Sequence, residues 1–377
     1  MRTTDKPFSI DKKRVYEAYK AVKSNAGAAG VDGQTIEQFE ADLQGNLYKL
    51  WNRMSSGSYF PPPVRAVSIP KKSGGQRILG VPTVADRVAQ MVIKQLIEPD
   101  LEPIFLADSY GYRPRKSALD AVGVTRQRCW KYDWVLEFDI KGLFDNIDHE
   151  LLLRAVRKHV TCKWALLYIE RWLTAPMEQD DGTQIARTCG TPQGGFSPIL
   201  SKALKAELQA RLTECRLELH PTKTKIVYCR DAKRRGKYPN VTFDFLGYCF
   251  RPRLVQNSRY TLFCGFTPAV SVSAMTAMRT TIRELGLRHR TELSMADIAR
   301  QINPLLRGWI AYYGRYTPSA LNPMLRYVNL TLRAWVMRKF KRFAAKTIRA
   351  GRFLERTARE HTDMFVHWRL GLTGVFA

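Results

Sequence analysis

The stretch Trp134-Val-Leu-Glu-Phe-Asp-Ile140, continued by Lys141-Gly-Leu-Phe-Asp145, decides how the rest of the chain is interpreted. Its apolar residues predict a short buried strand that ends at the carboxylate of Asp139. A carboxylate fixed at a strand end is what a two-metal phosphoryl-transfer enzyme uses to bind Mg²⁺. The pattern is weak by itself, because a strand-end Asp more often caps the turn that follows. Its meaning therefore depends on the rest of the sequence.

The charge of the chain indicates a polyanionic partner. The 377 residues include 61 Lys+Arg against 34 Asp+Glu, a formal net charge of +27. Nucleic acid is the leading class of partner, and an anionic membrane surface is the second. No stretch approaches the ~20 consecutive apolar residues of a spanning helix, and residues 1–10 lack the apolar core of a signal peptide. We therefore expect a soluble, cytoplasmic protein that does not bind membranes.

Local patterns in the first half of the chain predict mixed α/β structure. Residues 64–70 and 76–80 alternate about the turn Lys71-Lys-Ser-Gly-Gly75, which predicts a basic hairpin. Helical spacing of apolar residues predicts a helix over 84–96. Asp148 stands where it caps the start of another helix.

Helices are predicted at both ends of the chain. Before residue 57, apolar spacing predicts two helices around a Gly-rich loop at 25–33. Beyond Thr267 the pattern is helical, and proline predicts breaks in it. The predicted breaks lie near Asn303-Pro304, Thr317-Pro318 and Asn322-Pro323.

Several stretches resemble, in the same order, the motifs of group II intron reverse transcriptase/maturases. The segment around Asp139 and Asp145-Asn-Ile-Asp-His149 is similar to the first catalytic motif of that family. The other matching stretches are Ile69-Pro-Lys-Lys-Ser-Gly-Gly-Gln-Arg-Ile-Leu-Gly-Val-Pro-Thr83 with Asp86-Arg87 and Gln90, Ser109-Tyr-Gly-Tyr-Arg-Pro-Arg-Lys-Ser117, Gly190-Thr-Pro-Gln-Gly-Gly195 with Ser197-Pro198, Leu219-His-Pro-Thr-Lys-Thr-Lys225, Phe243-Asp-Phe-Leu-Gly-Tyr248 and Asn303-Pro-Leu-Leu-Arg-Gly-Trp-Ile-Ala-Tyr-Tyr-Gly314. The resemblance covers nearly the whole chain, so a chance match is not a serious competitor.

The resemblance implies a fold and a set of partners. The implied fold is an α/β right-hand polymerase-like fingers and palm, with the palm truncated, followed by an all-α thumb and maturase X domain. We expect an N-terminal helical extension over residues 1–60, fingers and palm over 61–262 with an interruption near 196–203, and the thumb/X domain over 263–377. Group II intron RNA is the implied partner, with a DNA target or primer as a further one, and Mg²⁺ is the implied cofactor.

The matched motifs also supply candidate site residues. Asp139 is the candidate catalytic residue and metal ligand. The candidates for binding template or nucleotide are cations and a Gly-rich loop that can approach phosphates or a base pair. They are Lys71, Arg77, Arg113, Gln193 and Gly194.

The family's Tyr-Ala-Asp-Asp hairpin, which belongs between Gly195 and Leu219, is absent from this sequence. Two Mg²⁺ ions ~4 Å apart carry four positive charges, which one Asp can neither neutralise nor orient. The adjacent pair Asp180-Asp181 precedes the Gly-Thr-Pro loop and is better explained as a hairpin turn with Gly182. We therefore expect an incomplete Mg²⁺ site, lost or severely impaired polymerase activity, and an unpaired apolar edge along residues 135–140.

The C-terminal third is the strongest predicted nucleic-acid-binding element. Its basic residues outnumber its acidic ones so far that a merely solvated helix face does not explain them, which favours RNA-backbone binding. The candidates for RNA binding are Arg307, Arg333, Arg338, Lys339 and Arg342. The interleaved aromatics fit a helix core stripe better than base stacking. They are Trp335, Phe340, Phe343 and Phe353.

The leading functional hypothesis is a protein that binds intron RNA and assists its splicing. Two alternatives remain open at this point. One is a non-catalytic RNA-binding remnant with no splicing role, and the other is an active RNA-directed DNA polymerase that uses carboxylates outside the recognised motifs.

Overall fold

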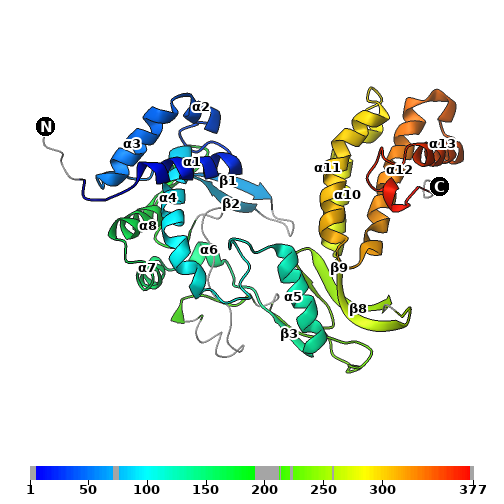
Figure 1. Cartoon of the computed structure of the whole chain (residues 1–377), viewed down its shortest axis with the longest axis horizontal. Helices are drawn as coiled ribbons and strands as arrows, with labels where there is room; N and C mark the ends of the chain where they lie inside the picture. Colours follow the sequence, from blue (N-terminus) through cyan, green and yellow to red (C-terminus); the bar gives the residue numbers. More distant parts are fainter. Residues whose placement is uncertain are drawn as a thin grey trace. The chain divides into compact units, whose positions relative to one another are not determined.

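The computed structural model describes residues 6–70, 76–191, 212, 214–220, 224–256 and 259–373. Contacts between residues divide the chain into two compact units, and each unit is built from two separate segments (Figure 1). The first unit combines residues 1–115 with 138–223, and the second combines 116–137 with 224–377.

The first unit places helices around a small sheet. Its elements are α1 (Lys12–Asn25), α2 (Ile36–Ala41), α3 (Leu43–Ser55), β1 (Val64–Pro70), β2 (Gln76–Val81), α4 (Val84–Leu101), α6 (Leu143–Asn146), α7 (His149–Arg157), α8 (Lys163–Thr174), β4 (Met177–Glu178) and β5 (Gln184–Ile185).

The N-terminal helices share one core with α4 and α8. Val15 of α1, Val88 of α4 and Tyr168 of α8 are buried in the same cluster, and the Tyr168 hydroxyl donates to the carbonyl of Met54 at 2.6 Å. Three helices stand where the spacing predicted two, because the Asp42 side chain accepts from a backbone N–H of the next turn and starts α3 separately from α2. The domain boundaries at residues 60 and 262 stay predictions.

The sheet of the first unit has the strand order β2-β1-β4-β5. The predicted hairpin is confirmed, since β1 and β2 pair antiparallel from Arg65 opposite Val81 to Pro70 opposite Gln76. Lys71 and the rest of the turn lie outside the described residues. β1 also pairs parallel with β4, and β4 turns back into β5 through Gly182, whose φ of +82° suits the tip of a hairpin.

The second unit contains two small sheets and a group of helices. Its elements are α5 (Ala118–Lys131), β3 (Trp134–Glu137), β6 (Lys225–Tyr228), β7 (Phe243–Phe245), β8 (Tyr248–Gln256), β9 (Leu262–Val270), α10 (Val272–Glu284), α11 (Met295–Tyr313), α12 (Asn322–Lys339) and α13 (Thr347–Glu360). No helix in the described parts of the chain is long and apolar enough to span a membrane.

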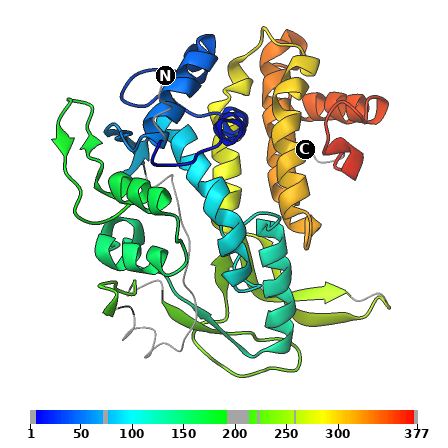
Figure 2. The ribbon, with the colours of Figure 1, turned by 60° about the vertical axis from the view of Figure 1, so that its left-hand side comes forward.

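The sheets of the second unit pack against α5. β3 pairs antiparallel with β6, and β7, β8 and β9 form an antiparallel sheet whose β8–β9 hairpin extends past α5 (Figure 2). The indole N–H of Trp130 in α5 donates to the carbonyl of Phe266 in β9 at 2.7 Å. Within the described residues β3 has one strand neighbour, so its other edge has no strand partner there.

The helices α10 to α13 form a core of their own, as the pattern predicts. The structure differs from the prediction at Asn303-Pro304, where α11 continues without a break. Burial of Ile302 and Leu306 on either side of the proline offsets the hydrogen bond that proline cannot donate. The breaks predicted at Thr317-Pro318 and Asn322-Pro323 are confirmed, and β9 continues three residues beyond Thr267.

Candidate functional site

Asp139 lies two residues beyond β3 and its side chain is exposed. Its carbonyl accepts from the backbone N–H of His220 at 2.7 Å, and Ile140 forms an isolated antiparallel bridge with Leu219. The first catalytic motif and the Leu-His-Pro motif are therefore paired through their backbones.

The segment after Asp139 also meets the start of the Gly-Thr-Pro loop. The backbone N–H of Thr191 donates to the carbonyl of Phe144 at 2.6 Å, and that of Gly190 donates to the carbonyl of Ile147 at 2.8 Å. Gly190 has φ +78°, and a Cβ there would lie 2.8 Å from the carbonyl oxygens of Phe144 and Asp145. Only glycine fits this close approach, so the contact with the segment after Asp139 explains the glycine at position 190.

Of the predicted nucleotide-binding residues, Arg77 is exposed on β2, where it pairs with Ile69 of β1. Gln193 and Gly194 lie outside the described residues, as Lys71 does. The structure therefore keeps Arg77 as an accessible cation on the predicted hairpin.

The Arg113 side chain binds residues of its own loop and the short helix before it. Its side chain is 8% exposed and binds Glu102 at 2.8 Å, and it donates to the carbonyls of Leu106 and Ser109. Because these partners already occupy the guanidinium, the structure gives Arg113 the role of holding the loop together.

A buried polar network centres on Asp86, in the first turn of α4. The carboxylate of Asp86 accepts from the Tyr59 hydroxyl at 2.7 Å, the Trp172 indole N–H at 2.6 Å and the Gln90 amide at 3.0 Å. Burial raises the pKa of Asp86 to about 6. The apolar spacing of α4 gives no signal for this network, because two of its three donors, Tyr59 and Trp172, lie far from Asp86 in the sequence.

Next to it, Arg87 holds the Gly-rich N-terminal loop. Its two terminal nitrogens donate to the carbonyls of Ala26 and Ala28 at 3.0 Å each. The resemblance placed Asp86 and Arg87 in a motif, and the structure shows that the first stabilises a core and the second fixes a loop.

The aromatic residues of the C-terminal helices belong to the core, as predicted. Trp335 is 1% exposed, and Phe340, Phe343 and Phe353 pack edge to face or tilted against one another beside it. They are therefore not a platform for bases.

The basic residues of the same helices fall into two groups. Arg307, Arg338 and Arg342 are exposed, whereas Arg333 is half-buried. The half-buried Lys339 donates to the carbonyls of Thr291 and Leu293 at 2.8 and 2.6 Å, so it fastens α12 to the loop before α11.

Helix α13 carries a row of arginines that belongs to the predicted basic C-terminal third but is not among the candidate RNA-binding residues. The row comprises Arg349, Arg352, Arg356 and Arg359, which are all exposed and recur at helical spacing. The opposite face of α13 is buried through Ala350, Leu354 and Ala358. Apolar periodicity alone separates the two faces, so this row could have been found from the sequence.

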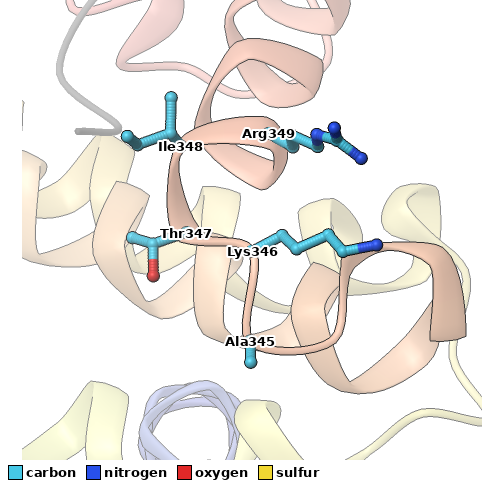
Figure 3. Close-up of a pocket in the computed structure, with 5 residues that line it drawn as sticks. All are labelled: Ala345, Lys346, Thr347, Ile348 and Arg349. Carbon is cyan, nitrogen blue, oxygen red and sulfur yellow. The ribbon is translucent and has the colours of Figure 1, made fainter.

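The turn that leads into α13 adds one more cation, Lys346. A pocket lined by residues 345–349 lies here, and Lys346 and Arg349 extend to one side of it, Thr347 and Ile348 to the other (Figure 3). The first turn of α13 contains no acidic residue and receives no side-chain cap. The N–H groups at this helix start and the two cations favour negative charge together.

Two family profiles match the chain. "Reverse transcriptase (RNA-dependent DNA polymerase)" matches residues 69–204, and "Group II intron, maturase-specific domain" matches residues 275–353. The first range contains Asp139, and the second contains the exposed arginines of α12 and the start of α13. The chain belongs to the group II intron reverse transcriptase/maturase family.

Individual relatives agree with the family. Protein YkfC of Escherichia coli K12 is 35% identical over 211 residues, 52% of this chain and 54% of that protein. Group II intron-encoded protein LtrA of Lactococcus lactis subsp. cremoris is 32% identical over 208 residues, 54% of this chain and 34% of that protein. The putative COX1/OXI3 intron 1 protein of Saccharomyces cerevisiae is 30% identical over 184 residues, 48% of this chain and 22% of that protein. The matched segments span about half of these relatives' length or less.

The reverse transcriptase family implies a divalent metal ion, and the residues described here do not form a site for one. No group of three or more His, Cys, Asp or Glu side chains capable of holding a metal ion occurs in the described part of the chain. Asp139 and Asp145 are exposed, and Asp148 caps α7. Within the residues that the structure describes, the donor set of two-metal catalysis is therefore not met.

Proposed function

We propose that this group II intron reverse transcriptase/maturase-family chain binds intron RNA through its C-terminal helices and assists the splicing of that RNA. The observation that carries the proposal is the separation of faces in α12 and α13. Aromatic and aliphatic residues form the core, and a row of exposed arginines faces solvent. Arginine binds phosphate in a bidentate manner, which suits a folded RNA backbone.

We further propose that the chain is laid out as fingers, truncated palm and thumb, and that its polymerase activity is lost or severely impaired. This part rests on the sequence, which lacks the Asp-Asp hairpin of the family. It also rests on the described part of the chain, where no group of three or more His, Cys, Asp or Glu side chains could hold a metal ion. A DNA target or primer is a further partner in this proposal.

Splicing assistance is tested with the full chain and the intron RNA encoded beside it. At a Mg²⁺ concentration too low for self-splicing, the protein should yield ligated exons. Replacing Arg349, Arg352, Arg356 and Arg359 together with Gln should reduce the splicing rate at least 10-fold. The matched control replaces the same four residues with Lys, which keeps the charge and should retain most of the activity. Equal rates for the Gln variant and the wild type would refute the proposed interface.

Polymerase activity is tested by primer extension on an RNA template with Mg²⁺. We expect no product above background, because one carboxylate cannot hold two cations. Extension that is abolished by Asp139→Ala would contradict this expectation and favour a polymerase with additional, unrecognised carboxylates.

A further inference from the structure

A cluster of three aromatic rings lies on the β3–β6 sheet, far in sequence from the maturase-specific helices. The Trp134 and Tyr228 rings are 4.9 Å apart, and the Tyr238 ring lies 4.6 Å from both. Tyr228 is 8% exposed, whereas Trp134 and Tyr238 are 46% and 47% exposed. Buried Tyr228 thus supports two rings that offer aromatic surface to solvent.

The loop that joins β6 to β7 surrounds this cluster with positive charge. Arg230, Lys233, Arg235 and Lys237 are exposed, and no acidic side chain in the described parts of the chain forms an ion pair with them. The carboxylates of Asp133 and Asp231 share the single guanidinium of Arg234, so the four exposed cations still give the loop a net positive charge.

The same loop is held in one conformation by its backbone and by Arg234. The Arg234 guanidinium donates to the carbonyls of Cys129 at 2.8 Å and Tyr132 at 2.6 Å, at the end of α5. The backbone N–H of Cys229 donates to the carbonyl of Asp133, and that of Tyr228 to the carbonyl of Asn240, at 2.8 Å each. A ligand would meet a preformed surface and would lose little affinity to ordering the loop.

We propose that this surface, the rings of Trp134 and Tyr238 with the cations of loop 230–237, binds single-stranded nucleic acid by stacking unpaired bases on the rings and contacting phosphates with the cations. Exposed aromatic rings beside exposed cations are the combination that single-strand binding uses, because the rings stack on bases while the cations contact phosphates. A second copy of this chain is a poor occupant, because two such patches would bring eight unpaired cations together. The surface lies outside residues 275–353, so it goes beyond the proposed function.

The experiment measures fluorescence anisotropy of the full chain with two labelled probes, a 12-nucleotide oligouridine and a 12-base-pair RNA duplex. Tyr238→Leu and Trp134→Leu keep apolar bulk but remove aromatic stacking, and each should weaken oligouridine binding about 5- to 10-fold and duplex binding less than twofold. Tyr260→Leu is the matched control, since Tyr260 is an 82% exposed tyrosine of the same unit outside the patch. Circular dichroism confirms that each variant folds.

Charge and position are tested separately. Replacing Lys233, Arg235 and Lys237 with Gln should reduce the slope of log affinity against log salt by about 2 for oligouridine. A 4-thiouridine oligonucleotide should crosslink to the peptides that contain Trp134 or Tyr238. If Tyr238→Leu and Trp134→Leu behave like Tyr260→Leu, or crosslinks map elsewhere, the inference is wrong. The same holds if Tyr238→Leu abolishes self-association in sedimentation velocity, because the patch would then bind another copy.

The two proposals fail independently. A wild-type chain that assists splicing but shows no effect of Tyr238→Leu on oligouridine disproves only this surface. A chain that stacks oligouridine as expected but gives no ligated exons disproves only the proposed function.

Discussion

At the scale of single residues, Asp86 makes the stability of the protein depend on pH. It is 1% exposed, and its carboxylate accepts three hydrogen bonds, yet burial raises its pKa to about 6 from the ordinary 3.8. Between these pH values the native state binds a proton that the unfolded state has released. The contribution of Asp86 to the free energy of unfolding is therefore fully present below pH 4 and is lost as the pH rises through 6. The total loss is about 3 kcal/mol.

The variant Asp86→Asn tests this pH dependence. Asparagine keeps an acceptor for Tyr59 and Trp172 but has no charge to bury, and the Gln90 amide can turn to accept from it. The unfolding free energy of the variant minus that of the wild type should rise by about 2–3 kcal/mol between pH 4 and 7. Urea denaturation at several pH values measures the difference, with the exposed Asp180→Asn as control. A difference that stays constant with pH would show that Asp86 titrates normally.

Two neighbouring cations of α12 should respond differently to substitution. Lys339→Met removes donors from the carbonyls of Thr291 and Leu293, so it should lower the unfolding free energy by roughly 1–3 kcal/mol. Arg338→Met removes an exposed charge, so it should change stability by less than about 0.5 kcal/mol. It should also reduce the salt slope of RNA binding by about one contact. Thermal unfolding and filter binding measure the two effects, and equal stability losses would contradict the assignment.

The sequence predicts which residues belong to the candidate site, but it does not always predict what each of them does. Arg77 and Arg113 both belong to basic motifs, and only the position of Glu102 gives Arg113 a partner inside its own loop. Sequence spacing predicts which elements carry cations, whereas tertiary neighbours decide which cations stay accessible. The cluster of Trp134, Tyr228 and Tyr238 was missed for the same reason.

At the scale of elements, the hairpin β1–β2, helix α4 and the aromatic core of α12 agree with the sequence patterns. The error at Pro304 came from local propensity, which the burial of the flanking turns overrides. The splitting of α2 from α3 depends on the Asp42 cap, a side-chain hydrogen bond that apolar periodicity does not register.

The Gly-rich loop before α2 depends on one side chain from α4. Arg87→Lys leaves a single ammonium group, which cannot replace a guanidinium that donates from two nitrogens to Ala26 and Ala28. We expect elastase to cleave within residues 26–33 roughly 10-fold faster in this variant, since about 1.5 kcal/mol is lost with one charge-assisted hydrogen bond. Arg53→Lys, at an exposed position of α3, is the control. Unchanged cleavage would mean that the loop is held by other contacts.

At the scale of the whole molecule, the chain alternates between its two units. Segment 116–137 joins the second unit together with residues 224–377, and the stretch between belongs to the first. The helical core of α10 to α13 uses residues from Val270 onward, but β9 pairs with β8 along its whole length. Cutting the chain at the predicted boundary near residue 262 therefore keeps the helices and removes the partner of β9.

Two fragments test this organisation. Residues 263–377 should be helical by circular dichroism but should aggregate, because β9 is left with an unpaired edge. Residues 116–137 joined to 224–377 by a short Gly-containing turn should stay monomeric in gel filtration. The join is geometrically simple, since Glu137 stands directly opposite Lys225 in the β3–β6 pair. A monomeric 263–377 fragment, or an aggregating joined fragment, would contradict the division into units.

The alternation between units also delays the packing of α5 while the chain is synthesised on the ribosome. Helix α5 emerges early, but its hydrogen-bond partner in β9 lies 136 residues later, between Trp130 and Phe266. At about 5–20 residues per second, that interval is roughly 7–27 s. Until β6 is made, the buried face of α5, which includes Val122 and Cys129, has no sheet to cover it, and the β7–β8–β9 sheet adds its part of the cover later still. Slow translation of the middle of the chain would lengthen this exposure, and a chaperone that shields α5 would improve the yield of folded protein.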